Sequence, residues 1–415
     1  MKSWRRPPHA SRSGKPRRRA RAVVTTAAVL VFVSVIALWI GVHHTTWMGP
    51  LFADTARSLV GTEAVARLEE FVYGVQDRWY RFSRKNDRPE AYWDVPSAPV
   101  QQPPAPAEPD KPEAPRFTLA DVGPVDKSWS APGDGTWMPV VDERRPADPP
   151  RMLKTLLHPD RNRSWTAVSV VAVDLRQVDL HLVTGRYEPK PTEPEAGGFQ
   201  RTGLVPEADQ DRLMAAFNGG FKLEHGHYGI RVDGVTLVRP RAKMCTIVRD
   251  SSSSVAIGPW EKFAGTDQAN ADWWRQTPYC MVEGGELHVG LRDPNATTWG
   301  CTLDGQVVIR RSAIGVSQDG KTLYVGIGDD TTARAIALAM EHAGAYTVAQ
   351  LDVNFSYPKF LLYGPKGDGS TELVAKPLTK GFEFTEDEYI RARSPRDFFY
   401  LTRKALAGQT ASNGG

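Results

Sequence analysis

One segment of the chain combines paired glycines with an amide side chain and is suited to binding an oxyanion. Residues 217–221 read Phe-Asn-Gly-Gly-Phe and follow an apolar run. Because Gly219 and Gly220 lack side chains, their backbone N–H groups can approach a bound oxyanion closely. The side-chain amide of Asn218 would add one more donor. An ordinary Asn-Gly turn is the structural alternative, since this dipeptide is the commonest hairpin signal.

An arginine pair and a carboxylate could supply the charges that cleavage of an anionic ester needs. Arg310 and Arg311 open a predicted strand, in which one of the two must point inward. A guanidinium binds phosphate or carboxylate through two hydrogen bonds, and an internal salt bridge is the alternative. Asp352 and Asn354 follow another predicted strand and would share a face if that strand continued. Asp352 would then act as a general acid or base, whereas an Asx-turn is the structural alternative.

Two histidines and two further carboxylates are candidates for substrate binding. The sequence Glu224-His225-Gly226-His227 would point both imidazoles to one side if it formed a strand. A metal site needs a third ligand that the sequence does not nominate, so we favour substrate hydrogen bonding or proton transfer. Glu224 and Glu283 are candidates for a second carboxylate, and solvation at a hairpin turn is their structural alternative.

A largely antiparallel sheet with one strand–helix–strand insertion is predicted to position these residues. Residues 178–182 alternate apolar and polar side chains, as in a half-buried strand. Residues 323–327 are predicted as a strand, 332–342 as a helix and 346–351 as a strand, so Asp352 follows a strand's carboxyl end. The predicted class is α+β. Four dipeptides between apolar runs suit tight hairpins: Asp233-Gly234, Gly284-Gly285, Asp304-Gly305 and Asp319-Gly320.

Three cysteines are too few for a disulfide scaffold, but one bridge is predicted. Cys280 and Cys301 enclose 20 residues. In an oxidising compartment, a bridge between them would add roughly 3 kcal/mol of stability. Cys245 would then be left over. A different pairing and three buried thiols both stay open, and no spacing of cysteine or histidine suggests zinc.

The start of this 415-residue chain predicts a membrane anchor. Residues 1–21 contain nine Lys or Arg and no acid, and residues 22–42 form a stretch of 21 residues without a charge. A helix of that length spans about 30 Å, one bilayer core. The segment runs on to Trp47 without a small-residue cleavage site, which favours a single transmembrane helix over a signal peptide. The positive-inside rule places the tail in the cytoplasm and the rest across the membrane.

The remainder divides into three regions and a tail. Residues 51–85 carry apolar side chains at helical spacing and predict an amphipathic helix. That helix would lie on the membrane surface, pair with a second copy or pack on the main domain. Residues 86–116 form a proline-rich linker, 117–402 the main domain and 403–415 a disordered tail. Beyond the basic start the chain has 43 basic and 48 acidic residues, which argues against nucleic-acid binding.

The ordered set of motifs resembles the phosphodiester glycosidase family. The resemblance covers residues 117–402, and its Leu-Asp-x-Asn ending is similar to a bacterial branch of that family. Many members follow the strand aspartate with a run of glycine and serine, whereas Asp352 is followed by Val-Asn-Phe-Ser-Tyr. The set comprises residues 215–221, Arg311 to Val316 with Asp319-Gly320, the alanine-rich predicted helix, Gly344-Ala345 and Leu351-Asp352.

The resemblance implies a hydrolase that cleaves a glycosyl phosphodiester in envelope or exopolysaccharide metabolism, at the outer face of the bacterial cytoplasmic membrane. Arg311 and the amides of Gly219 and Gly220 would hold the phosphate, with Asn218 beside them. Asp352 would face the sugar as nucleophile, base or electrostatic stabiliser. This chemistry calls for no organic cofactor. The alternative is a non-catalytic module that binds an envelope polysaccharide, which the altered residues after Asp352 favour.

Overall fold

The structure is a computed structural model, and its described residues all belong to one of the two units into which the chain divides. These units are Met1–Ala66 and Arg67–Gly415. The predicted basic tail, the predicted membrane span, most of the predicted linker and the residues after 404 lie outside the described residues. Within the described part, no helix combines the length and apolar character that a membrane span needs. The described residues are 75, 77–91, 93, 116–266, 271–292, 299, 308–354, 356–367 and 369–404.

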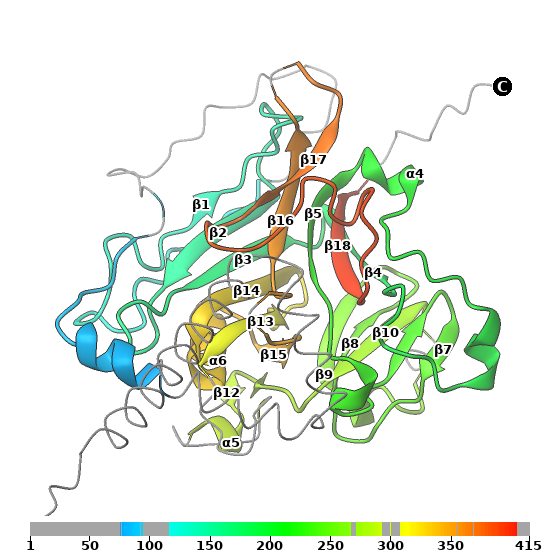
Figure 1. The fold of residues 1–415 in the computed structure, drawn as a ribbon, viewed down its shortest axis with the longest axis horizontal. Coiled ribbons are helices and arrows are strands. Elements are labelled where there is room, and N and C mark those ends of the chain that lie inside the picture. Colours follow the sequence, from blue (N-terminus) through cyan, green and yellow to red (C-terminus); the bar gives the residue numbers. More distant parts are fainter. Residues whose placement is uncertain are drawn as a thin grey trace, which may run out of the picture. The chain divides into compact units, whose positions relative to one another are not determined.

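Three sheets make up the described domain (Figure 1). The first has eight strands in the order β1-β2-β3-β14-β13-β15-β11-β12. Every pair of strands that the structure describes is antiparallel, which confirms the predicted, largely antiparallel α+β class. The first sheet consists of β1 (Met138–Pro139), β2 (Met152–Leu157), β3 (Val168–Asp174), β14 (Thr322–Thr331), β13 (Ile309–Val316), β15 (Thr347–Gln350), β11 (Val282–Glu283) and β12 (Glu286–Leu287).

The second and third sheets have five strands each, and short helices lie in the connections between strands of the domain. The second sheet consists of β7 (Val235–Val238), β6 (Ile230–Val232), β10 (Trp273–Thr277), β8 (Cys245–Arg249) and β9 (Val255–Pro259). The third consists of β17 (Leu373–Pro377), β16 (Phe360–Pro365), β5 (Leu213–Asn218), β18 (Phe398–Arg403) and β4 (Val178–Val183). The short helices are η1 (Pro194–Gly198), α4 (Glu207–Gln210), η2 (Leu223–His225), η3 (Trp260–Lys262) and α5 (Val289–Arg292).

The predicted strand–helix–strand insertion is present as β14, α6 (Ala333–His342) and β15. Both strands pair antiparallel with β13, so they run parallel to each other on either side of it. The side chain of Thr332 caps the helix by accepting a hydrogen bond from the Ala335 amide at 3.0 Å. Gly344 ends the helix at a φ of 109°, which glycine adopts without strain.

A hairpin is confirmed at three of the four predicted dipeptides, and both residues have positive φ at two of them. Asp233 and Gly234 join β6 to β7 with φ values of 50° and 75°, as a type I′ turn requires. The Gly284-Gly285 pair joins β11 to β12, and Asp319-Gly320 lies between β13 and β14. The fourth dipeptide, at residues 304–305, lies outside the described residues.

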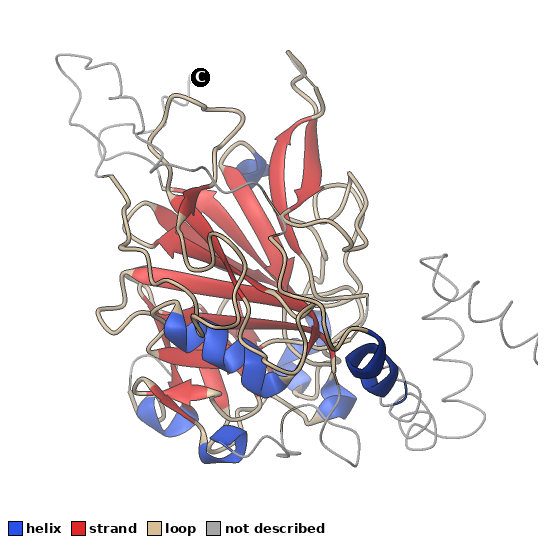
Figure 2. Cartoon of the chain, turned by 90° about the vertical axis from the view of Figure 1, so that its left-hand side faces the viewer, coloured by secondary structure: helices blue, strands red, loops and turns tan. Residues whose placement is uncertain are grey.

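The first sheet is covered on both faces. Alternate residues of its strands, among them Val171 and Ile314, pack into a core with the second and third sheets. The intervening residues, among them Ala172 and Ala313, pack with Ile336 and other residues of α6. Figure 2 shows the helix lying across the strands. A residue at the end of a central strand can therefore face either the helix layer or the other sheets.

The disulfide prediction is wrong. Cys245 is bonded to Cys280, so Cys280 is not available to Cys301, which lies outside the described residues. The reason is strand register, because β10 pairs with β8 so that Thr277 lies opposite Cys245 and the chain then brings Cys280 back beside it. The bridge ties the second sheet to the segment that leads into β11.

The end of the predicted amphipathic helix packs on the domain. Residues 77–83 are helical, and the Asp77 carboxylate accepts hydrogen bonds from Arg163 at 2.7 and 2.8 Å. The ring of Tyr80 lies edge-on to Trp165, with 5.8 Å between centroids. This segment is thus attached to the same body that follows the proline-rich linker.

Candidate functional site

Asp352 lies where the first sheet meets the third. The chain leaves β15 at Gln350, and the amide of Leu351 donates to the carbonyl of Ser312 in β13 at 3.0 Å. The next amide, that of Asp352, donates to the carbonyl of Gly219 beyond β5, again at 3.0 Å. The Asp352 side chain is only 1% exposed. Two sheets therefore position this carboxylate by backbone hydrogen bonds on either side of it.

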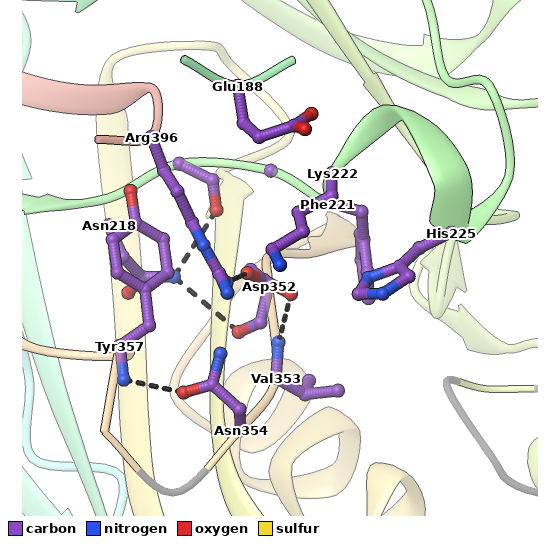
Figure 3. Close-up of polar contacts among 12 residues, drawn as sticks. Glu188, Asn218, Phe221, Lys222, His225, Asp352, Val353, Asn354, Tyr357 and Arg396 are labelled. Atoms are coloured by element: carbon purple, nitrogen blue, oxygen red, sulfur yellow. Dashed lines mark hydrogen bonds and ion pairs between the residues drawn. The ribbon is translucent and has the colours of Figure 1, made fainter. Parts of the chain in front are cut away.

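The Asp352 carboxylate is held by a cation and an amide. One oxygen forms an ion pair with the Arg396 guanidinium, and the other accepts a hydrogen bond from the Val353 amide at 2.9 Å (Figure 3). The guanidinium also lies over the ring of Tyr357, 4.7 Å from its centroid. Burial raises the pKa of Asp352, although Arg396 and His225 oppose that change. A raised pKa makes the ionised carboxylate a stronger base.

His225 and Lys222 complete the polar cluster. Figure 3 shows both side chains pointing toward the Asp352 carboxylate from the segment that contains η2. The His225 side chain is 42% exposed, and burial lowers its pKa more than Asp352 raises it, so the imidazole is neutral at pH 7. The Lys222 ammonium lies 3.8 Å from Glu224, whose own side chain is 52% exposed. The cluster thus joins a buried carboxyl to a neutral imidazole that solvent can reach.

Asn218 is a buried residue that stabilises the backbone around this cluster. Its side chain is fully buried, its oxygen accepts from the Lys359 amide at 3.3 Å, and its NH₂ group donates to the carbonyl of Gly219 at 3.2 Å. The same NH₂ group lies 3.5 Å from the carbonyl of Asp352. Asn218 therefore joins the ends of β5, β15 and β16, and it acts on Asp352 through the backbone.

Asn354 forms the Asx-turn that was the alternative to a site role. Its side-chain oxygen accepts hydrogen bonds from the amides of Ser356 at 2.9 Å and Tyr357 at 2.6 Å. Because β15 already ends at Gln350, the expected strand face shared with Asp352 does not form. Asn354 shapes the turn that brings Tyr357 under the Arg396 guanidinium.

The amides of the paired glycines are both bound by one residue of the protein, Asp397. The amide of Gly220 donates to the Asp397 carboxylate at 3.0 Å, and the amide of Gly219 donates to the Asp397 carbonyl at 2.9 Å. Arg275 forms an ion pair with the same carboxylate at 2.8 Å, and both side chains are at most 1% exposed. The predicted use of these two amides for a substrate oxyanion is therefore not what the structure shows.

Close packing around this ion pair explains both glycines. A Cβ atom on Gly219 would lie 2.3 Å from the Asp397 carbonyl oxygen, and one on Gly220 would lie 2.6 Å from the Arg275 guanidinium carbon. Neither distance is tolerable, so any larger residue would displace the loop. Arg275 also donates to the carbonyl of Phe221 at 2.6 Å, which fixes the end of the same segment.

Arg311 in β13 points away from Asp352. Arg311 is 2% exposed, and its guanidinium donates to the carbonyls of Trp299 at 2.9 Å and Thr331 at 3.2 Å. The hydroxyl of the next residue, Ser312, instead donates to the Asp352 carbonyl at 3.3 Å. Since successive side chains point to opposite faces of a strand, Arg311 lies on the other face of the sheet. The predicted phosphate-binding role of Arg311 is therefore not supported.

Arg310 adopts the salt-bridge alternative. Its guanidinium lies 2.9 Å from Asp329 and 2.5 Å from Glu383, and it stacks on the ring of Phe382 at 4.2 Å. The Arg310 guanidinium is therefore bound by side chains of the protein itself. Arg396 is the arginine that pairs with the Asp352 carboxylate. It follows a Ser-Pro pair, and no recognisable motif marks it in the sequence.

The histidine pair is not in a strand, which corrects that expectation. His225 ends the short helix η2, and Gly226 and His227 follow with φ values of 146° and 51°. The two imidazoles are therefore not aligned on one side of a strand, and only His225 lies beside Asp352. Glu283 lies in β11 with its carboxylate 3.0 Å from the Lys262 ammonium, and its side chain is 47% exposed.

The comparisons with known proteins give distant structural similarity only. No family model matches the chain, and no curated protein matches its sequence. The catalytic domain of zebrafish N-acetylglucosamine-1-phosphodiester alpha-N-acetylglucosaminidase, auto-inhibited by its pro-peptide, is similar at 16% identity and a TM-score of 0.40, over 64% of this chain and 87% of that chain. A hypothetical protein from Synechocystis is similar at 12% identity and a TM-score of 0.32, over 62% of this chain and 65% of that one.

A metal centre is not evident in the described part of the chain. None of its clusters brings together three or more His, Cys, Asp or Glu side chains in an arrangement that could hold a metal ion. The cluster around Asp352 can instead exchange a proton beside two cations. Its members are Asp352, His225, Arg396 and Lys222.

Proposed function

We propose that the chain is a hydrolase that cleaves a glycosyl phosphodiester, with Asp352 as its central group. The observation that supports this proposal is the buried Asp352 carboxylate placed between the Arg396 guanidinium and the half-exposed His225 imidazole. The motif resemblance supplies the substrate class. The enzyme would act at the outer face of the cytoplasmic membrane, with residues 22–42 as its anchor.

The cluster offers a partner for each charge that changes during cleavage. The bond between the anomeric carbon and the bridging oxygen breaks, and that oxygen leaves with the electron pair as part of a phosphate monoester. Water forms the new bond to carbon, and ionised Asp352 takes one of its protons. The neutral His225 imidazole passes that proton to solvent. Arg396 and Lys222 balance the negative charge on the departing phosphate.

A phosphate monoester is a good leaving group, so it needs no protonation by a second carboxyl. This distinguishes the site from a common glycosidase, in which one of two carboxyl groups donates a proton to the leaving oxygen. The structure is consistent with a single catalytic carboxyl, because Glu224 is exposed and Glu283 is paired with Lys262. Asp352 therefore suffices as the single carboxylate in the proposed reaction.

The experiment is hydrolysis of a chromogenic sugar phosphodiester by the full chain. Asp352→Asn should reduce kcat at least 100-fold, because a positioned general base contributes about 10²- to 10⁴-fold. Arg396→Lys should raise KM or lower kcat, since a single ammonium cannot replace the planar fork. Glu283→Gln is the matched control and should keep the activity of the original chain. Equal rates in all three variants, with folding intact, would refute the assignment.

A polysaccharide-binding module is the second candidate, and one observation favours it. The amides of Gly219 and Gly220 are bound to Asp397, so this segment offers no backbone donors to a transition state. A site without them could still bind an anionic glycan through Arg396 and Lys222. Calorimetric binding of the same phosphodiester without turnover over long incubation, lost in Arg396→Lys but kept in Asp352→Asn, would establish this function instead.

A further inference from the structure

The helical segment before the proline-rich linker exposes large apolar side chains. Val75, Trp79 and Phe82 are 45%, 63% and 69% exposed. Their spacing of four and three residues places them on one side of a helix, and the rings of Trp79 and Phe82 lie 6.3 Å apart between centroids. Exposed aromatic side chains gathered in this way commonly mark a contact surface.

The opposite side of the segment is fixed to the domain, so the apolar side cannot turn inward. Asp77 is 9% exposed and forms two hydrogen bonds with Arg163. The Tyr80 ring packs against Trp165, and the Arg84 guanidinium lies over both rings, at 4.9 and 5.7 Å. Helical geometry puts Asp77, Tyr80 and Arg84 on the side away from Trp79. The domain therefore presents the apolar side outward.

The charges of the segment favour binding to an anionic partner. Residues 75–85 contain four basic residues and one acid, and that acid is Asp77, which is paired with Arg163. The Arg81 guanidinium also pairs with Asp77 at 3.2 Å, although its side chain is 42% exposed, and the Lys85 ammonium lies 6.0 Å from the Phe82 ring centroid. Tryptophan and phenylalanine flanked by arginine and lysine are typical of helices that lie in the headgroup region of an anionic bilayer.

Over the residues that the structure describes, the exposed aromatic area of this segment is too small to form a stable dimer by itself. An aromatic side chain offers about 150–250 Å² when fully covered, so Trp79 and Phe82 at their observed exposure offer roughly 200–330 Å² together. A specific protein–protein interface buries about 800 Å² on each partner. A bilayer needs no such minimum, because binding scales with the apolar area and with electrostatic attraction to the lipids.

We propose that residues 75–85 lie on the surface of an anionic lipid bilayer, with Trp79 and Phe82 in the headgroup region. The segment precedes the proline-rich linker but packs on the domain that follows it, so the linker does not separate the domain from this surface. The domain is therefore held against the membrane in one orientation. A lipid-linked substrate would reach it within the plane of the bilayer.

The experiment is photo-crosslinking from single positions in the full chain, reconstituted in vesicles of phosphatidylethanolamine and phosphatidylglycerol at three to one. Benzoylphenylalanine replaces Trp79 in one variant and Phe82 in a second. Tyr187 is the matched control, because it is an aromatic side chain, 58% exposed, in the loop after β4. In Figure 1 that strand lies on the other side of the domain from the blue helical segment.

Lipid adducts at positions 79 and 82, at least fivefold above those at position 187, are the expected result. The yield should fall when phosphatidylcholine replaces phosphatidylglycerol, because the charge contribution is lost. Adducts to a second copy of the chain, adducts to another part of the same chain, or equal lipid yields at all three positions would each overturn the proposal. Circular dichroism of every variant, with the far-UV signal of the original chain, verifies that the domain is folded.

Discussion

Removing the charge of Asp397 should destabilise the domain strongly. Arg275 and Asp397 are at most 1% exposed and lie 2.8 Å apart, so Asp397→Asn would leave a buried guanidinium without its counter-ion. The asparagine oxygen can still accept from the Gly220 amide, whereas its NH₂ group would face the Arg275 N–H that now donates to the other carboxylate oxygen at 3.3 Å. Breaking a buried pair in this way costs about 3–5 kcal/mol.

The structure places the expected loss at the lower end of that range. Arg275 keeps its hydrogen bonds to the carbonyls of Phe221 at 2.6 Å and Gln276 at 3.0 Å, so part of its donor capacity stays satisfied. We therefore expect a loss of about 3 kcal/mol, a large fraction of the 5–15 kcal/mol that stabilises a typical domain.

Urea unfolding of the full chain in detergent micelles, followed by tryptophan fluorescence, measures this loss. Arg275→Met and the double variant complete a double-mutant cycle. The double variant should be more stable than the sum of the two single losses predicts, by at least about 1 kcal/mol, because it leaves no unpaired charge. A loss below about 1 kcal/mol in Asp397→Asn, or strict additivity in the cycle, would contradict the reasoning.

Two further outcomes are expected. Burial, reinforced by Asp329, raises the pKa of Asp330 to about 6. Between about pH 4 and 6 the folded chain therefore retains a proton that the unfolded chain has lost. The stability that this group contributes is present at low pH and is lost as the pH rises from about 4 to 6. Asp330→Asn should therefore flatten the decline of about 3 kcal/mol in the free energy of unfolding over that window, measured by urea titration at each pH. The Cys245–Cys280 bridge closes 35 residues, so the Cys245→Ser, Cys280→Ser variant should lose about 4 kcal/mol, and a non-reduced digest should contain the linked pair of peptides.

Local features of the fold could be predicted from the sequence because their causes are local. The predicted strand 323–327 covers only the first half of β14, whereas the predicted helix 332–342 and strand 346–351 match α6 and β15 to within one residue at each end. Turn dipeptides marked three hairpins, since positive φ at Asp233 and Gly234 is a property of those two residues. The position of Asp352 after a strand end could also be predicted, because the strand that precedes it is marked by neighbouring residues.

The partners of Asp352 could not be predicted, because they depend on long-range register. Arg396 is 44 positions away and lies in a bend before β18, with no glycine or motif to mark it. Asp397 is 122 positions from Arg275, so the residue that binds both glycine amides could not be predicted from the sequence. The cysteine pairing failed similarly, since the pairing of β8 with β10 decides which thiols meet.

Arg396 and Asp397 are neighbours in sequence, and this couples the site to the core. The Arg275 ion pair and the two glycine amides hold the backbone at Asp397, and from that backbone Arg396 reaches the Asp352 carboxylate. A change that loosens the ion pair must therefore also move the guanidinium at the site. The glycine segment thus contributes to the site indirectly: it binds Asp397 and thereby positions the cation that pairs with the Asp352 carboxylate.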